Sequence, residues 1–249
     1  GASCIYSQQT FDAANCGMCG RACGSGQECL MGNSVCTSET PVKLFGGSPA
    51  CAIMADTRVT CWGSESSNSR GDGPSSDSVN PTFVQGLTGV VDGCAGSSFA
   101  CAYTDRGEVW CWGSNGSTQL GSNPSDATLP VKVSVGVASE PGSVTSVSCG
   151  SSHACAAVAG EVWCWGSNGS GQSQPTNTTN PSAPQAVVLG TSTSVVQVAA
   201  GTDFSCALLT DGTARCWGTN QYGQLGAGLP TGASTIYPPA QVSGLAGAA

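Results

Sequence analysis

The sequence predicts an all-β fold: a propeller-like array of four blades of about fifty residues each, stapled by disulfides and preceded by a small cysteine-rich module. Three observations carry this prediction. The tripeptide Cys-Trp-Gly begins at residues 61, 111, 164 and 216, a second cysteine precedes each at 51, 101, 155 and 206, and six more cysteines fall before residue 37. A fixed period of this length is typical of propeller blades. We therefore expect a disulfide module at 1–38 and a four-repeat propeller-like domain at 39–249.

The N-terminal module is expected to depend on disulfides, because a segment this short cannot build an apolar core. Its cysteines are irregularly spaced, with glycines between them; they are Cys4, Cys16, Cys19, Cys23, Cys29 and Cys36. The spacing does not select one pairing among the many that are possible. Cys16 and Cys19 also form a C-x-x-C, which could serve redox chemistry or half of a zinc site. Glycine and polar neighbours favour a structural staple.

Each repeat contains a β-hairpin. In the fourth repeat, apolar runs at 204–209 and 214–217 flank Asp211-Gly212, a strong turn signal. The two cysteines of a repeat are symmetric about the turn, so they face each other at a distance that a disulfide can span. Buried free thiols are the alternative. The predicted pairs are Cys51 with Cys61, Cys101 with Cys111, Cys155 with Cys164, and Cys206 with Cys216.

Two cysteines stand outside the hairpins. Cys94 and Cys149 lie just before Gly96 and Gly150, at nearly equivalent places in neighbouring repeats, which predicts a bridge between adjacent blades. Sixteen cysteines in all favour an oxidising compartment, so we expect a secreted protein, extracellular or at the cell surface. A start at Gly1 rather than Met is expected of a mature exported form.

The composition excludes several function classes. Charged residues make up 9% of the chain, with 7 Lys and Arg against 15 Asp and Glu and a formal net charge of −8. Such a chain offers no positive surface to a phosphate backbone, so no nucleic-acid partner is expected. No apolar run of about 18 residues is present, so no membrane span is expected. With one histidine and no nucleophile, phosphate-binding or zinc motif, we expect no metal, no cofactor and no catalytic residue.

A run of motifs in the fourth repeat carries a resemblance to a known family. Gly201, Asp211-Gly212, Trp217-Gly218-Thr219-Asn220 and Gly223-Gln224-Leu225-Gly226 follow one another along about 26 residues. This series resembles the repeat of the regulator of chromosome condensation family, and His153 stands at that family's His position in repeat three. The resemblance implies a propeller of four-stranded blades, commonly about seven of them. The N-terminal cysteines, with Asn15-Cys16-Gly17, are similar to the stigma-specific type of module, which secreted bacterial proteins also carry.

The family's nuclear role is not expected here, because this chain has neither a basic surface nor the cysteine usage of a reducing nucleus. The number of repeats also departs from the family. Blades that pack about seven to a ring cannot close as four without a change of angle, and an open arc would expose apolar faces. We expect one of three solutions: a tightened four-blade ring, capping by the N-terminal module, or self-assembly into a larger ring or filament.

Four residues are candidates for binding a ligand or partner. Trp110 and Trp163 vary among the repeats, unlike Trp62, Trp112, Trp165 and Trp217, which recur and are expected in the core. Two exposed indoles could stack on a sugar or anchor a protein, although both could equally be buried. Arg70 and Asp72 flank a glycine in an adhesion-type tripeptide, for which a solvated turn is the alternative reading. Asn115, Asn168 and Asn177 fit the glycosylation pattern.

These observations favour a secreted, non-enzymatic structural or adhesive protein that associates with itself, or with an extracellular protein or glycan, through blade faces and loops. The alternative is a secreted protein-binding propeller, such as an enzyme inhibitor or a carbohydrate-binding module. His153 could act as a general base, but without an accompanying nucleophile it is expected to fix a turn by hydrogen bonding.

Overall fold

The computed structural model describes residues 27–29, 36–38, 40–63, 69–73, 78–121, 125–136, 140, 142–232 and 236–245. The cysteines at positions 4, 16, 19 and 23 lie outside the described residues, as does most of the predicted N-terminal module. Within that module, β1 (Gln27–Cys29) pairs antiparallel with β2 (Cys36–Ser38), and Cys29 is directly opposite Cys36 in the register.

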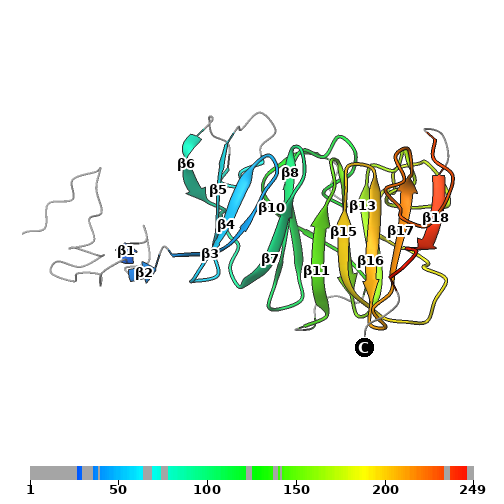
Figure 1. Cartoon of the computed structure of the whole chain (residues 1–249). Helices are drawn as coiled ribbons and strands as arrows, with labels where there is room; N and C mark the ends of the chain where they lie inside the picture. Colours follow the sequence, from blue (N-terminus) through cyan, green and yellow to red (C-terminus); the bar gives the residue numbers. More distant parts are fainter. Residues whose placement is uncertain are drawn as a thin grey trace, which may run out of the picture.

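The rest of the described chain forms four antiparallel sheets of four strands each, which we call blades 1 to 4 (Figure 1). Blade 1 holds β3 (Pro41–Phe45), β4 (Ala50–Met54), β5 (Val59–Gly63) and β6 (Ser78–Phe83); blade 2 holds β7 (Val90–Ala95), β8 (Phe99–Thr104), β9 (Val109–Gly113) and β10 (Ala127–Val133). Blade 3 holds β11 (Val144–Cys149), β12 (His153–Val158), β13 (Glu161–Gly166) and β14 (Gln185–Ala186); blade 4 holds β15 (Val195–Ala200), β16 (Phe204–Leu209), β17 (Ala214–Thr219) and β18 (Ile236–Gln241). The all-β, four-blade fold predicted from the repeat is confirmed.

The second and third strands of every blade form the predicted hairpin, stapled by a disulfide. Gly107, Gly160 and Gly212 occupy the turns with φ of 74°, 81° and 77°, a region that only glycine enters without strain. The hairpin cysteines are register partners with Cα atoms 4.0–4.1 Å apart. The disulfides join the residues that the spacing pairs: Cys51 with Cys61, Cys101 with Cys111, Cys155 with Cys164, and Cys206 with Cys216.

The hydrophobic core lies between the blades rather than within any one of them. Three clusters of buried side chains each combine the facing sides of two successive blades. One side of each joint carries the hairpin disulfide of the earlier blade, and the other side carries the tryptophan of the later blade. In the joint between blades 3 and 4, for example, Cys155 and Cys164 pack in the same cluster as Trp217. Each blade therefore has two different faces, one for the blade before it and one for the blade after it.

The first strands of the blades, β3, β7, β11 and β15, lie next to one another along the inner side of the array. The Cys94–Cys149 disulfide joins β7 to β11, as the sequence predicts, with Cα atoms 5.4 Å apart. Glycines allow the turns after these strands to approach closely, since a Cβ on Gly96 would lie 2.5 Å from the carbonyl oxygen of Gly150. In blade 1 this role belongs to Gly47, and not to Gly46, which has open space around it.

The four blades form an open array. Blade 1 with β6 stands at one extreme and blade 4 with β18 at the other, while the inner strands face the same side (Figure 1). The tightened four-blade ring, one of three solutions expected from the sequence, is therefore wrong. In the described part of the chain, no helix is long and apolar enough to cross a membrane.

Candidate functional site: the two end faces

The recurring tryptophan is the key residue of each joint between blades. Trp112, Trp165 and Trp217 are all 0% exposed. The indole N–H of Trp165 in blade 3 donates to the carbonyl oxygen of Gln119 in blade 2, at 2.9 Å. Trp217 in blade 4 makes the same bond to the carbonyl oxygen of Gln172 in blade 3, also at 2.9 Å. A buried indole favours a hydrogen-bond partner, and in these two joints the preceding blade supplies it from its backbone. In the joint between blades 1 and 2, the buried Nε1 of Trp112 has no such partner.

The loop that offers this carbonyl is shaped by an asparagine three residues after the tryptophan. The side-chain oxygen of Asn115 accepts the backbone N–H of Leu120 at 2.8 Å, and Asn220 holds Leu225 in the same way at 3.1 Å. Asn168 accepts two backbone N–H groups, from Ser173 at 3.0 Å and from Gln174 at 2.6 Å. The Trp-Gly-x-Asn motif thus builds the surface on which the tryptophan of the following blade rests.

The buried amides also bear on the predicted glycosylation sites. Asn115 and Asn168 are buried and hydrogen-bonded within these loops, so their side chains are not accessible in the folded protein. Asn177 is exposed, and of the three acceptor sites it alone remains accessible.

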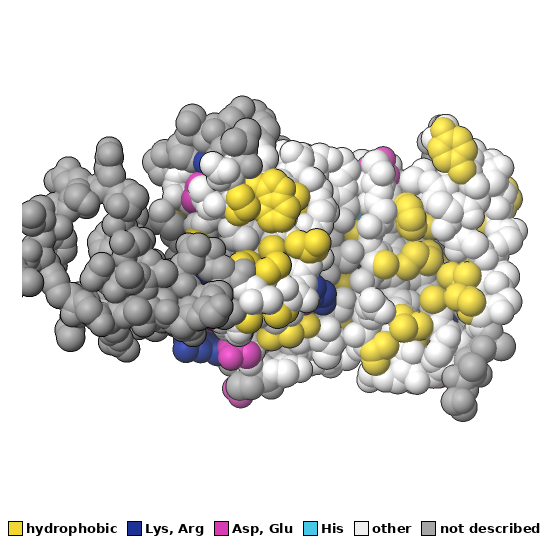
Figure 2. Space-filling view, turned by 60° about the vertical axis from the view of Figure 1, so that its left-hand side comes forward, with side chains coloured by type: hydrophobic (Ala, Val, Ile, Leu, Met, Phe, Trp, Pro, Cys, Tyr) yellow, Lys and Arg dark blue, Asp and Glu magenta, His cyan; other side chains and the backbone are white. Residues whose placement is uncertain are grey.

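Blade 1 exposes the face that its successors bury. We define the blade 1 end face by the residues that line a hollow of about 320 Å³; they are Pro41, Leu44, Ala52, Met54, Thr60, Trp62, Pro81 and Phe83. Leu44 is 69% exposed, whereas its equivalents on β11 and β15, Val147 and Val198, are buried. Trp62 is partly exposed, unlike the other three tryptophans of its kind. With this end turned forward, Figure 2 shows hydrophobic side chains on a surface with few charged ones.

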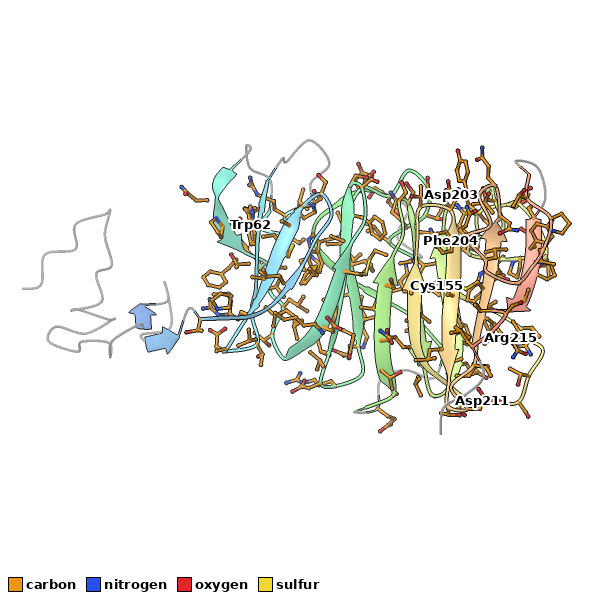
Figure 3. All side chains as sticks on the ribbon, viewed as in Figure 1. Trp62, Cys155, Asp203, Phe204, Asp211 and Arg215 are labelled. Carbon is orange, nitrogen blue, oxygen red and sulfur yellow. A yellow bond between two sulfur atoms is a disulfide. The ribbon has the colours of Figure 1, made fainter. Side chains whose placement is uncertain are left out.

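Blade 4 exposes the opposite kind of face. We define the blade 4 end face by Phe204, Cys206, Leu208, Val242 and Leu245, of which the first four repeat positions that are buried in blades 1 to 3. Leu208 is 38% exposed, but its blade 2 and blade 3 equivalents, Tyr103 and Ala157, are buried. Leu245 is 48% exposed, while Leu87, its counterpart in blade 1, is buried. Trp62 and Phe204 mark the opposite ends of the array in Figure 3.

The candidate tryptophans Trp110 and Trp163 occupy equivalent register positions on neighbouring blades. Each is half-buried in a crevice between blades: Trp110 packs against the cluster of blades 1 and 2, and Trp163 against that of blades 2 and 3. Their indole N–H groups donate to Glu108 Oε2 at 3.4 Å and Glu161 Oε2 at 3.1 Å. A hydrogen bond from Lys132 holds the pKa of Glu108 below its usual range, so that carboxylate is ionised at neutral pH.

The structure contradicts an adhesive role for Arg70 and Asp72. Arg70 is 1% exposed, and its Nη2 lies 3.0 Å from Asp72 Oδ2, which also accepts the hydroxyl of Thr82 at 2.7 Å. The alternative of a solvated turn is equally wrong. Arg70 occupies the position of Leu120 and Leu225, eight residues after the tryptophan, and this explains why it points inward. Its charge is compensated inside the protein and not presented to a partner.

His153 is a structural residue that links blades 3 and 4. It is fully buried, and its Nε2 lies 2.9 Å from the hydroxyl oxygen of Ser205, which in turn donates to the carbonyl oxygen of Gln172 at 2.9 Å. Because the Ser205 hydroxyl donates to Gln172, it accepts from Nε2–H of His153. Burial lowers the pKa of His153 to about 4. A Cβ on Gly150 would overlap the ring, which explains the glycine beside it.

The sequence did not single out the glutamine carbonyls of the loops or the end faces as functional. A backbone carbonyl carries no side-chain chemistry, so its only signal is the recurrence of the loop motif around Gln119, Gln172 and Gln224. The exposure of a blade face depends on whether another blade covers it, and a single repeat cannot reveal this.

Comparisons with known proteins agree with this geometry. Models of the regulator of chromosome condensation (RCC1) repeat match residues 90–119, 144–172 and 195–224, and also 106–157 and 159–208. The ultraviolet-B receptor UVR8 of Arabidopsis thaliana is 33% identical over 191 residues, which are 74% of this chain and 42% of that protein. The human E3 ubiquitin-protein ligase HERC2 is 29% identical over 207 residues, 81% of this chain and 4% of that protein. The chain thus spans less than half of either relative.

Solved structures show the same fold at lower identity. Prp20p of Saccharomyces cerevisiae, described with its binding properties to Gsp1p and histones, superposes with a TM-score of 0.69 at 18% identity, over 83% of this chain and 51% of that chain. Human WBSCR16 also gives 0.69, at 19% identity, over 88% of this chain and 59% of that chain. The four blades therefore follow the curvature of a much longer propeller. From its repeats, its blades and these matches, the chain belongs to the regulator of chromosome condensation (RCC1) repeat family.

Proposed function

We propose that this chain is a secreted, non-enzymatic extracellular protein that associates with further copies of itself, as a larger ring or a filament. One observation carries the proposal. The blade 1 and blade 4 end faces are the two halves of a joint that the chain builds three times internally, and neither half is buried by another blade of the described chain. Apolar faces of this kind are typical of surfaces that bind a partner.

The disulfides support the extracellular part of the proposal. Five bridges join ten cysteines in the described residues, and such bridges persist in oxidising compartments. The four hairpin bridges each close a loop of 9 or 10 residues, and the chain-entropy model assigns each about 2–3 kcal/mol of stability. A protein with these bridges is well suited to a site outside the cell.

Sedimentation velocity over a hundredfold range of protein concentration, with the disulfides intact, tests self-association. The proposal predicts species heavier than the 24.6 kDa of one chain, with a share that rises with concentration. A single species of one chain's mass at every concentration would contradict it.

A second candidate is a propeller that binds a different extracellular protein, such as an enzyme inhibitor, or a glycan. The description of Prp20p, a protein of the same fold, names protein partners, and this favours the candidate. Trp110 and Trp163, each with an adjacent carboxylate, are the residues to examine for glycan binding. A change in tryptophan fluorescence on titration with cell-surface oligosaccharides, lost in Trp110→Phe and Trp163→Phe, would favour the glycan form of this candidate over self-association.

A further inference from the structure

We infer that a second copy of this chain docks its blade 1 end face onto the blade 4 end face of the first, head to tail. In this junction the indole N–H of Trp62 donates to the carbonyl oxygen of Gln224 in the other copy. The inference rests on the proposed function, and it names the surfaces and the pairing through which self-association takes place.

The internal joints are the template for this junction. In two of them, a tryptophan donates across the blades to the carbonyl oxygen of a loop glutamine, at 2.9 Å both times. That glutamine always lies seven residues after the tryptophan of its own blade. Blade 4 builds the same loop, because Asn220 holds Leu225 and Leu225 is fully buried. Gln224 is therefore placed as Gln119 and Gln172 are, but no blade of the described residues lies against it.

The blade 1 end face, which we call the head, carries the side chains that form such a joint in the later blades. Trp62 pairs opposite Ala50 on the blade 1 hairpin, as Trp165 pairs opposite Ala154 in blade 3. Leu44 projects from β3 beside the hollow on this face, where Val147 and Val198 fill the equivalent joints in blades 3 and 4. The hollow is the space that the preceding blade occupies elsewhere in the array.

The blade 4 end face, which we call the tail, carries the side chains that pack against such a head in the internal joints. Leu208 and Leu245 stand where Ile53 and Leu87 of blade 1 pack beneath blade 2. The Cys206–Cys216 disulfide stands where Cys51–Cys61 is covered in the same joint; Cys51 is fully buried, but Cys206 is partly exposed. The residues that define the two end faces are uncharged. The guanidinium of Arg58 lies 3.6 Å over the ring of Phe83, but it is paired with Asp56, so docking would bury no unpaired charge.

A second copy fits these faces better than an unrelated occupant, because docking would continue an interface that the chain already forms three times. The two faces are different, so the contact is heterologous, and it either closes into a ring or propagates as a filament. The structural match supports closure at a small number of copies. One chain superposes on 51% of Prp20p, so two copies in a row supply about the residues of one such propeller.

The test uses one variant for each face. Leu44→Asp places a charge on the head, and Leu208→Asp places one on the tail; both positions are exposed, so the fold should be kept. Val188→Asp, at a position on blade 3 that is 81% exposed and away from both faces, is the matched control. Circular dichroism and an absence of free thiols establish that each variant is folded, and sedimentation velocity measures its mass.

We expect the wild type and Val188→Asp to associate, and each face variant alone to remain at the mass of one chain. An equimolar mixture of the two face variants should form a 1:1 dimer and grow no further. Leu44→Asp keeps its blade 4 end face and Leu208→Asp keeps its blade 1 end face, so each pair can form one junction only. Trp62→Phe, which keeps the ring but removes the donor, should raise the dissociation constant about tenfold.

Several outcomes would overturn the inference. If the wild type and both face variants associate equally, other surfaces are used; the inference then fails while self-association stands. If Leu208→Asp dimerises on its own, the contact is head to head. A monomeric wild type rejects the proposed function together with this inference. If, in addition, Leu44→Asp lowers its melting temperature, the head face belongs to the chain's own N-terminal segment.

Discussion

Trp62 and Trp217 occupy the same position of their repeats, yet their surroundings differ. Trp217 is fully buried and donates to a carbonyl of the preceding blade, whereas Trp62 is partly exposed at the start of the array. The Cys-Trp-Gly tripeptide does not distinguish them, since both follow a hairpin cysteine and precede a glycine. The difference comes from the neighbour that each residue has, and this makes Trp62 the residue from which a missing contact can be inferred.

Residue-level prediction from sequence succeeded where the repeat constrains the position and failed where one repeat departs from it. The cysteine pairs follow from the symmetry of the hairpin. The sequence predicts a surface position for Arg70, because arginine is rarely buried unless it is paired. The structure shows that Arg70 is buried and paired with Asp72, at the position that Leu120 and Leu225 fill in blades 2 and 4.

His153 should make the stability of the protein depend on pH. Because burial lowers its folded-state pKa to about 4, the unfolded chain binds a proton near its ordinary pKa of about 6.5 while the folded chain does not. Stability is therefore complete above about pH 6.5 and falls as the pH drops toward 4, by about 3 kcal/mol from this residue.

Replacement of His153 by Phe, the residue at this position in blades 2 and 4, should remove that share of the pH dependence. Urea unfolding at about pH 7 and pH 4 measures it, and the wild type should lose about 3 kcal/mol more than the variant between the two conditions. Carboxylates titrate in both proteins, so their contribution cancels in the comparison. An equal loss of unfolding free energy in both proteins would show that His153 does not cause this part of the pH dependence.

At the level of elements, the sequence predicted the hairpins because their signals are local. The Asp211-Gly212 turn and the flanking apolar runs define strands β16 and β17 without reference to other blades. The outer strands were less predictable. β14 has two residues, Gln185–Ala186, while β10 has seven, Ala127–Val133, and nothing in the hairpin period fixes their length. Which blade faces stay uncovered was likewise not predictable, since it depends on the angle between blades.

The inner turns provide a test of how the blades approach one another. A Cβ on Gly150 would overlap the carbonyl oxygen of Gly201 in the next blade and the ring of His153, so Gly150→Ala must push the blades apart. We expect it to destabilise the protein by more than about 2 kcal/mol.

Gly46→Ala is the control for this substitution, because no atom lies within 4 Å of its Cβ position, and it should change stability by less than about 0.5 kcal/mol. The midpoints of urea unfolding compare the two variants with the wild type. A Gly150→Ala variant as stable as Gly46→Ala would mean that the inner turns are not in the close contact described here.

The described residues form an open row of four blades, and several properties follow from that openness. The hydrophobic clusters lie between blades, so a row of four blades has three complete joints and leaves one uncovered joint face at each end. Electrostatic repulsion between the two uncovered end faces is weak, because Asp, Glu, Lys and Arg make up only 9% of the chain. The number of repeats, together with the low charge, predicts association. The structure indicates where it would take place: at Trp62 and Leu44 on the blade 1 end face, and at Leu208 and Gln224 on blade 4.

Imaging of the disulfide-intact chain by electron microscopy tests this account most directly. Head-to-tail docking predicts particles in which successive copies join end to end, so that blade 4 of one copy abuts blade 1 of the next in a continuous ring or filament. Isolated four-blade arcs at all concentrations, or copies joined through any other surface, would contradict it.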